Sequence, residues 1–584
     1  MYNGFMFRLL KNYTKDGWWA AILGPVFTVI EVILDSYIPL VMADIIDVGI
    51  YESMNGDMSY ILNKGLLMVV LAFLAAITGA LSGLFSSISS TKFVKNIRMA
   101  MYSKIQTYDF ENIEKYPVST VVTRLTTDMR MMRMAYVSIV RMLIRAPFNL
   151  IISAYFVFSL NNKLAAIFAF AIPILGTGLI LIYAKAHPRF RDMMLRFDDL
   201  DANLEENIEG IRVVKTFVRE DYENVKFEKS SSNVTRAQRF AESLVIIDKP
   251  FFELVMYVCM ILIAWFGGKD VVAGNMSTGD FMAYLSYVKA ILFSLLMIST
   301  VFMQVIMAQA SVDRANEILD EKPSIDDENN DENLLVEDGS IEFKDVCFKY
   351  SLEGEKDVLS NINLKIESGE VIGILGPTGA SKSTLVQLIP RLYDTNSGEV
   401  LVSGHNVKEY KLVNLRDAVA MVLQKNTLFS GSVRENMKWG NPEATDEEII
   451  EACKNAQAHD FVIAHPEGYD RELGQGGVNV SGGQKQRLCI ARALLKKPKI
   501  IILDDSTSAV DTDTDHRIQL ALKEKLAGMT TIIIAQRVSS VKEANRIIMM
   551  NDGKIEDIGN HEELLERNTV YRDLYNTQTK GVSE

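Results

Sequence analysis

Six apolar stretches in the first half of the chain constrain its fold more than any other feature. Each is long enough for a helix to cross the hydrocarbon core of a bilayer, which takes about 20 mostly apolar residues. They lie near residues 18–46, 61–88, 136–160, 164–183, 244–266 and 281–308. Because lipid offers no hydrogen-bond partners to a bare backbone, these stretches predict six membrane-spanning helices. Beyond about residue 310 the chain has the pattern of a soluble α/β protein.

The segments between the predicted spans alternate in length and charge. The first, third and fifth are short, whereas the second and fourth are long and rich in Lys and Arg. This bias predicts a multi-pass protein of the cell (plasma or inner) membrane, with both termini, the long loops and the soluble part in the cytoplasm. The long loops lack Gly/Pro clusters, so we expect helical stalks that turn near 109–118 and 208–220. A short amphipathic helix over 5–13 is expected to lie at the interface.

Ionisable residues inside the predicted spans are functional candidates, because burying them in a membrane is costly. Glu31 and Asp35 are spaced i,i+4 on one face of the first span. They form either an acidic patch that lines a substrate cavity and attracts cations, or a pair that is bonded to a neighbouring helix or wet near the outer mouth. Arg141 and Arg145 have the same spacing near the cytoplasmic end of the third span, where snorkelling to headgroups is expected.

Composition narrows the classes of function. The chain has 584 residues with 61 Lys+Arg against 74 Asp+Glu, a net charge of −13. This balance argues against nucleic-acid binding, which needs a basic face. Four distant cysteines exclude a disulfide scaffold. Residues 320–338 are acidic and poor in aromatics, which predicts a solvated linker between a transmembrane domain, 1–319, and a second domain, 339–584.

A glycine-rich turn in the second domain indicates phosphate binding. It follows the apolar run VIGILG and approximates G-x-x-x-x-G-K-[ST], whose backbone N–H groups wrap a phosphate at the start of a helix. Lys382 is expected to reach the β- and γ-phosphates, and Ser383 to bind Mg²⁺. Ser381 departs from the pattern, because it stands where the last glycine belongs. The turn consists of Gly376, Pro377, Thr378, Gly379, Ala380, Ser381, Lys382, Ser383 and Thr384.

A second acidic element supports this interpretation. The run KIIILDDSTSAVD predicts a buried strand that ends in carboxylates, and Asp504 is placed to orient Mg²⁺. The order and separation of the two elements are those of a P-loop ATPase, so ATP and Mg²⁺ are the expected cofactors.

Further motifs resemble those of ATP-binding cassette (ABC) ATPases. The segment Val480-Ser481-Gly482-Gly483-Gln484 resembles the family's signature motif. Gln424 matches the Q-loop glutamine, also a Mg²⁺ ligand, and Tyr350 matches the aromatic residue that stacks on adenine. Residues 508–511 resemble the D-loop. The six spans with two long cytoplasmic loops resemble the membrane domain of the exporter-type (type IV) subfamily, in which 109–118 and 208–220 would be coupling helices.

The resemblance implies a fold and an assembly. The fold is a six-helix transmembrane domain with long cytoplasmic helical stalks, followed by an α/β P-loop ABC ATPase domain. In such proteins two ATPase domains hold two ATPs head to tail between them. The signature residues Ser481, Gly482, Gly483 and Gln484 would then face the γ-phosphate on the partner's P-loop. One chain carries half of this assembly and must dimerise.

Two residues depart from the family pattern at positions that take part directly in ATP hydrolysis. Asp505 stands where the family has a glutamate that acts as general base or orients water, and its side chain is shorter by roughly 1.5 Å. Gln536 replaces the switch histidine, so it can hydrogen-bond but cannot carry an imidazolium charge. Together with Ser381, they predict a degenerate site that binds ATP and hydrolyses it slowly or not at all; independent tolerated variation is the alternative. In ELGQGG, Gln475 and Gly476 replace charges that the family often carries near its coupling helices.

These features predict one half of a heterodimeric exporter. Its intact signature would complete the competent site of a second, non-identical half-transporter. By resemblance its substrates would be amphipathic or drug-like small molecules. Two alternatives stay open at this point: an importer of siderophore or metal complexes with the same fold, and an ATP-sensing regulatory half-transporter.

Overall fold

The computed structural model describes residues 4–52, 58–328, 330–350, 357–505, 510–525 and 528–580. The chain divides into two compact units. The first comprises Met1–Gln106 and Val118–Glu321, and the second comprises Thr107–Pro117 and Lys322–Glu584. The second unit thus includes a short piece of chain, containing helix α4 (Phe110–Lys115), that is inserted between two long helices of the first.

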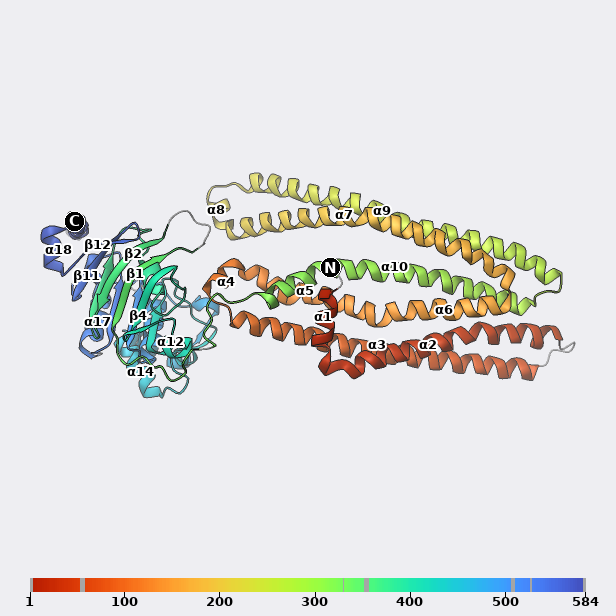
Figure 1. Cartoon of the computed structure of the whole chain (residues 1–584), viewed down its shortest axis with the longest axis horizontal. Helices are drawn as coiled ribbons and strands as arrows, with labels where there is room; N and C mark the ends of the chain where they lie inside the picture. Colours follow the sequence, from red (N-terminus) through yellow and green to blue (C-terminus); the bar gives the residue numbers. More distant parts are fainter. Residues whose placement is uncertain are drawn as a thin grey trace. The chain divides into compact units, whose positions relative to one another are not determined.

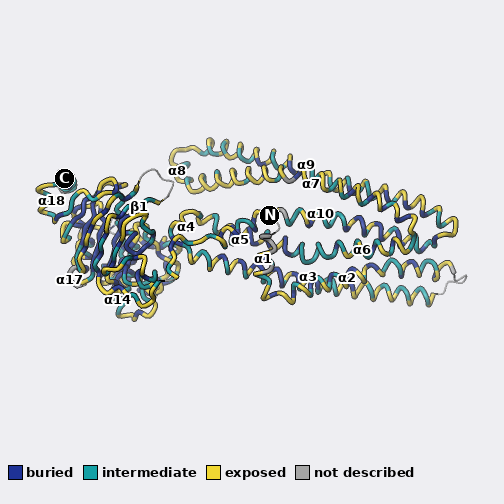
Figure 2. Tube along the Cα trace, viewed as in Figure 1, coloured by how far each residue is buried: buried dark blue, intermediate teal, exposed yellow. Residues whose placement is uncertain are grey.

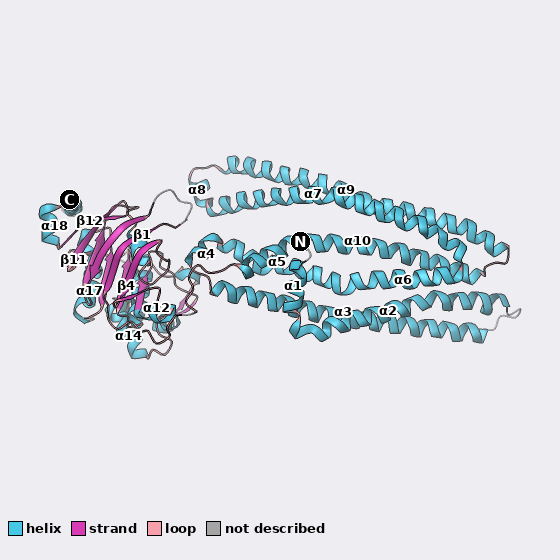
Figure 3. Ribbon diagram, in the orientation of Figure 1, coloured by secondary structure: helices cyan, strands magenta, loops and turns pink. Residues whose placement is uncertain are grey.

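The described residues of the first unit form helices joined by short turns (Figures 1 and 3). Its long helices are α2 (Trp18–Asp44), α3 (Met58–Gln106), α5 (Val118–Val137), α6 (Leu143–Leu160), α7 (Asn162–Glu209), α9 (Glu220–Val272) and α10 (Thr278–Asp320). The shorter elements are α1 (Gly4–Tyr13), the 3₁₀-helix η1 (Lys15–Gly17), the π-helices η2 (Ile45–Glu52) and η3 (Ser138–Met142), and α8 (Ile211–Thr216).

Six helical segments in the described ranges are long and apolar enough to cross a membrane, which confirms the predicted spans. Several run far past the length that a bilayer requires, as expected for helices that continue into stalks. The long helices turn at α4 and at α8, and side-chain caps mark two other ends. Asn161 accepts hydrogen bonds from the first backbone N–H groups of α7, and Ser277 does so for α10.

The helices of the first unit pack mainly in pairs, α2 with α3 and α7 with α9, while α10 lies along α6, α5 and α2. The buried residues of α10 include Tyr284 and Tyr287, and the Tyr287 hydroxyl donates to the Ser36 carbonyl of α2 at 2.6 Å. Large apolar side chains such as Phe73 and Ile180 are exposed. Figure 2 shows that exposed positions recur along the long helices of this unit. An apolar outside is what a lipid-facing bundle needs.

The second unit holds an antiparallel and a mostly parallel sheet. The antiparallel sheet has the strand order β2-β1-β4-β5 and the larger sheet the order β12-β11-β3-β10-β9-β6, with only β12 antiparallel to its neighbour. The strands are β1 (Ile341–Phe348), β2 (Leu359–Ile366), β3 (Val371–Leu375), β4 (Ser397–Val402), β5 (His405–Asn406), β6 (Val419–Val422), β9 (Ile500–Asp504), β10 (Thr530–Ile534), β11 (Arg546–Asn551) and β12 (Lys554–Gly559). A short pair, β7 (Gly431–Ser432) and β8 (Glu472–Leu473), stands apart.

The central strands are buried on both faces, which explains their continuous apolar runs. Successive residues alternate between two cores. Ile500 and Ile502 pack into one, and Ile501 and Leu503 into the other. The helices around the sheets are α11 (Lys382–Gln387), α12 (Leu412–Ala418), α13 (Val433–Lys438), α14 (Asp446–Asn455), α15 (His459–Ile463), α16 (Gly482–Leu495), α17 (Thr512–Lys525), α18 (His561–Arg567) and α19 (Thr569–Lys580). The 3₁₀-helices are η4 (Gly468–Asp470), η5 (Gln475–Gly477) and η6 (Val538–Ser540).

The acidic segment that precedes β1 differs from the prediction of a solvated linker. Two apolar residues within it, Ile325 and Val336, are buried. The Asn330 amide donates to the carbonyls of Lys408 and Tyr410. The few apolar and amide side chains of the segment attach it to the second unit, while most of its carboxylates stay in water.

Candidate nucleotide site

Four neighbouring parallel strands end at one edge of the larger sheet. They run in the order β3, β10, β9, β6. The glycine-rich turn follows β3, Gln536 follows β10, Asp504 ends β9 and Gln424 follows β6. Ligands of open parallel sheets bind outside the carboxyl ends of the strands. The topology therefore gathers four separate sequence predictions at a single edge.

The turn after β3 adopts a conformation that favours glycine at three points, Gly376, Gly379 and Ser381, which all have positive φ. Gly376 has φ +155°, and a Cβ there would lie 2.2 Å from the Met550 carbonyl oxygen, so a side chain is excluded. Ser381 has φ +66° and ψ +26°, in the left-handed region, immediately before α11. For a residue with a Cβ this region costs roughly 1–2 kcal/mol. The substitution of glycine by Ser381 thus keeps the shape of the loop but strains it.

Lys382, Ser383 and Asp504 form the predicted phosphate and magnesium group. Lys382 Nζ donates to the Gly376 and Pro377 carbonyls at 2.8 and 2.9 Å. Ser383 Oγ donates to Asp504 Oδ1 at 2.9 Å. Asp504 is 3% exposed, and burial raises its pKa although the Ser383 hydrogen bond opposes the shift. A buried carboxylate paired with a hydroxyl is a donor set of hard oxygens, so these residues fit Mg²⁺ with ATP.

Asp505 lies between the two glutamines that the sequence singled out. Gln536 Nε2 donates to Asp505 Oδ2 at 2.9 Å, and the Gln424 side chain also hydrogen-bonds this carboxylate. Burial raises the pKa of Asp505, and these two hydrogen bonds counteract the shift. The three residues predicted to be catalytic are therefore in contact. An amide can orient a carboxylate or a water molecule but cannot take up a proton, so Asp505 is the one base among the three.

Tyr350 lies near the end of β1, close to the phosphate loop. Its hydroxyl is 2.9 Å from Thr384 Oγ1, and its ring packs edge-on against Phe348 and Tyr393. The residue is nevertheless partly exposed. This arrangement leaves an aromatic face available to a nucleotide base, as the family resemblance implies.

The signature segment starts helix α16 and faces outward. Ser481 caps the helix: its Oγ accepts from the Gln484 N–H, and the Gln484 side chain accepts from the Ser481 N–H. Ser481 and Gly482 are exposed. The positive end of a 14-residue helix is thus exposed at the surface of this chain. Gly483 and Gln484 form the next part of the same turn.

The D-loop prediction is only partly described. Ser508 and Ala509 lie outside the described residues. Asp511 caps α17, because its Oδ1 accepts from the Thr514 N–H at 2.9 Å. Upstream of the signature, Gln475 and Gly476 lie in η5, where Gly476 has φ +65°.

Helix α4 is attached to the second unit by residues that sequence reasoning missed. Asp109 caps α4 and also accepts from the backbone N–H groups of Ser324 and Ile325 and from the Ser324 hydroxyl. The Tyr393 hydroxyl donates to Glu114 Oε1 at 2.7 Å. Burial, then the hydrogen bond to Glu114, raises the pKa of Tyr393, which keeps it a neutral donor. No spacing pattern links Tyr393 to α4, so the sequence carried no signal for this contact.

Within the first unit, the structure corrects one prediction about charged residues. Arg145 does not extend to headgroups: it pairs with Glu31 Oε1 at 2.5 Å and Asp35 Oδ2 at 3.2 Å. Arg145 forms these ion pairs because an isolated charge within the span would be energetically costly. The Glu31 carboxylate fits beside α3 because residue 79 is glycine: a Cβ on Gly79 would lie 2.9 Å from Glu31 Oε1. A substrate cavity at Glu31 and Asp35 stays a prediction, and the Asp35 side chain is 44% exposed.

Comparison with known proteins agrees with both units. The family described as "ABC transporter transmembrane region" matches residues 21–308, and the family "ABC transporter" matches residues 359–508. The "Uncharacterized ABC transporter ATP-binding protein YfiB" of Bacillus subtilis (strain 168) is 35% identical over 92% of this chain and 93% of its own length.

Two further relatives have names that state a function. The "ATP-dependent lipid A-core flippase" of Desulfotalea psychrophila is 34% identical over 83% of this chain and 84% of its own length. The "Putative multidrug export ATP-binding/permease protein YgaD" of Bacillus subtilis (strain 168) is 32% identical over 85% of both chains. With six candidate spans and a P-loop site on one polypeptide, the chain belongs to the ABC transporter family, as a half-transporter with fused membrane and ATPase domains.

Proposed function

We propose that this chain is one half of a heterodimeric exporter that uses ATP to move amphipathic or drug-like molecules across the cell membrane. Its own nucleotide site binds Mg²⁺ and ATP but hydrolyses ATP slowly. Its signature motif completes a competent site on a second, non-identical half-transporter. The ATPase domain and both termini lie in the cytoplasm.

One observation carries the proposal of slow hydrolysis. The carboxylate at the position of the general base, Asp505, is held by the amides of Gln536 and Gln424. Asp505 also has φ +48°, in the left-handed region. A general base must come within about 2.6–3.2 Å of the group whose proton it takes. The shorter side chain of Asp505, held by two amides, is poorly placed to reach a water molecule at the γ-phosphate. The strained Ser381 acts on the same site.

The proposed pairing rests on surfaces that the chain leaves open. Ser481 and Gly482 point outward at the start of α16. Phe429 and Trp439 stack with ring centroids 4.2 Å apart and are both exposed on the ATPase domain. Exposed aromatic pairs are typical of interaction sites. A second ATPase domain would cover the signature, and the exposed aromatic pair is a candidate contact for another part of the partner.

Export of amphipathic molecules is proposed from the relatives and from the lipid-exposed helices. Relatives of similar length include a lipid A-core flippase and a multidrug export protein. The charged group of Glu31, Asp35 and Arg145 is the candidate contact for a polar or cationic part of the substrate, because it places charge within a span.

The test is ATP hydrolysis by the purified chain alone and together with the product of an adjacent half-transporter gene. The pair is then repeated with Gln484→Ala in this chain and with Glu→Gln at the partner's catalytic base. We expect little hydrolysis by the chain alone, a large gain on pairing, and loss of the gain in both variants. Substrate-stimulated hydrolysis and transport by the pair would separate an exporter from a regulatory subunit.

Robust turnover by the chain alone would overturn the proposal. It would show that Asp505 and Gln536 are competent and that a homodimer suffices. The variant Asp505→Glu sharpens the result. If slow hydrolysis follows from the short carboxylate, the longer side chain should raise the rate of ATP hydrolysis by the paired transporter. The matched change Asp513→Glu, at an exposed position of α17, should leave this rate unaltered.

A further inference from the structure

One side chain of the C-terminal helix α19, Gln578, hydrogen-bonds the backbone of the segment that follows β10. It contacts two positions there, Gln536 and Val538. Gln578 Nε2 donates to the Gln536 carbonyl at 2.9 Å, and Gln578 Oε1 accepts from the Val538 N–H at 2.8 Å. The side-chain amide thus pairs with residues 536 and 538 as a neighbouring strand would. Two bonds from one amide fix both the position and the direction of this segment.

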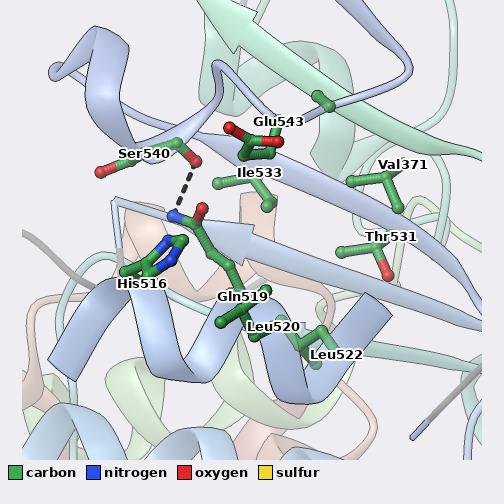
Figure 4. A pocket seen from close by; sticks show the side chains of 10 residues that line it. Val371, His516, Gln519, Leu520, Leu522, Thr531, Ile533, Ser540 and Glu543 are labelled. Atoms are coloured by element: carbon green, nitrogen blue, oxygen red, sulfur yellow. Dashed lines mark hydrogen bonds between the residues drawn. The ribbon is translucent and has the colours of Figure 1, made fainter. Parts of the chain in front are cut away.

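A second helix holds the same segment from its other end. Ser540 Oγ donates to Asp515 Oδ2 at 2.6 Å. Gln519 Nε2 donates to the Ser540 carbonyl at 2.8 Å, the bond drawn as a dashed line in Figure 4. Both partners come from α17, and the Gln519 side chain extends from that helix beside His516 in Figure 4. The segment 536–540, which we call the switch segment, is therefore tied to α19 at its start and to α17 at its end.

The side chain of Gln536 continues from this fixed backbone into the nucleotide site. Its amide donates to Asp505, as described above. Gln536 also shares a cleft of about 450 Å³ with residues 376–378 of the phosphate loop and with Val570, Leu574 and Thr577 of α19. The C-terminal helix thus lies against the two loops that would enclose a terminal phosphate.

We propose that Gln578 is a positioning residue for Gln536, so that the C-terminal helix sets how tightly this chain holds the γ-phosphate of ATP. A typical hydrogen bond changes an equilibrium constant about fivefold, and the two bonds of Gln578 restrain the backbone from which Gln536 reaches Asp505. Without them the amide of Gln536 samples other positions. This inference rests on the proposed role of Gln536 at the γ-phosphate.

Gln578 does not anchor α19 to the domain. That task falls to buried Tyr571, and Leu574 packs against the same core. Gln578 is itself only half-buried. Removing its amide should therefore leave the helix in place and release the switch segment alone. The substitution Gln578→Leu does this, because leucine is similar in size and forms no hydrogen bonds.

The experiment compares ATP with ADP on the assembled transporter. An azido-ATP photoprobe labels this chain in the presence of Mg²⁺, and ATP or ADP competes for the label. For Gln578→Leu we expect the half-competing concentration of ATP to rise by up to about thirtyfold, because two hydrogen bonds worth about fivefold each are lost. ADP lacks the γ-phosphate, so its value should stay within about twofold of the parent protein. Asn576→Ala, exposed on the same helix, is the matched control and should change neither nucleotide.

A double variant decides whether the effect passes through Gln536. If Gln578 acts by positioning Gln536, then Gln578→Leu adds nothing to Gln536→Ala. Equal weakening of ATP and ADP, no weakening of ATP, or full additivity would each overturn the proposal. Competition reads affinity rather than turnover, so it stays informative even if this chain proves to hydrolyse ATP rapidly and the proposed function fails.

Discussion

The two short helices where the long helices turn, α4 and α8, have opposite surroundings. Each has six residues. α4 is capped by Asp109, and it buries Asn112 within the second unit. α8 has no side-chain cap and buries no residue. Five apolar side chains in and around it, which we call the α8 tip, are exposed: Ile208, Ile211, Val213, Phe217 and Val218.

Helix α4 thus belongs to the second unit and buries a residue there, whereas α8 buries none of its own residues. Val218 is 79% exposed and has φ +51°, an unfavourable conformation for a β-branched residue. Exposed apolar side chains grouped at a helix end mark an interaction site. We therefore expect α4 to be an internal joint of the chain and the α8 tip to be a contact with the partner half-transporter.

The strongest test of the internal joint is Asp109→Ala. Loss of the cap costs about 1 kcal/mol and loss of the charged hydrogen bonds to Ser324 and Ile325 about 2 kcal/mol more. We expect the free energy of local opening of α4, measured by hydrogen exchange, to fall by about 3 kcal/mol. Glu111→Ala, exposed on the same helix, is the control and should have little effect. Unchanged protection in Asp109→Ala would show that α4 is not held by this residue.

Acidification should weaken the same joint. Burial by itself would raise the pKa of Asp109, but the hydrogen bonds from Asn112, Ser324 and Ile325 outweigh it, so the pKa lies below its ordinary value of about 3.9. An acid with a lowered pKa in the folded state stabilises it above the ordinary pKa and loses this effect as the pH falls. Protection of α4 should stay constant from neutral pH to about pH 5 and decline below about pH 4. A decline already above pH 6 would point to another group.

A smaller effect is expected from Tyr393→Phe. This change removes the hydroxyl that donates to Glu114 and keeps the ring, which lies edge-on to Phe110 with centroids 5.9 Å apart. Because Glu114 is exposed and regains water, the loss should be about 1 kcal/mol in the opening of α4. Tyr393→Leu, which also removes the aromatic contact, should cost more. Equal effects of the two changes would assign the contribution of Tyr393 to the hydrogen bond alone, and a cost in Tyr393→Leu without one in Tyr393→Phe would assign it to packing.

Patterns of spacing predicted the spans, the phosphate loop and the strands that carry the site, because these elements depend on local sequence. The signature and the pair formed by Asp505 and Gln536 were accessible through the family resemblance. The contacts of Asp109, Tyr393 and Gln578 were not, since each joins residues far apart in sequence by one to three hydrogen bonds. Such bonds leave no periodic signal.

Arg145 is another residue whose contacts could not be predicted from the sequence. Its place near the end of a predicted span indicated snorkelling, yet the structure pairs it with Glu31 and Asp35 of another helix. The sequence contained all three charges but not the packing of α2 against α6 that brings them together. Ser381 is a similar case, because the sequence showed a lost glycine but not that its left-handed conformation is retained.

The substitution Phe217→Ser in the α8 tip should have the smallest effect on stability. It is also the most direct test of the difference between α4 and α8. Phe217 is 70% exposed, so the folding free energy of the chain should change by no more than about 0.5 kcal/mol. In the assembled transporter, however, substrate-stimulated ATP hydrolysis should fall about tenfold, as expected when an apolar anchor is removed from an interface. Lys229→Ala, exposed on α9, serves as the control for changes on the stalk. If Phe217→Ser lowers stability in the single chain, or leaves the coupled activity intact, then α8 resembles α4 and needs no partner.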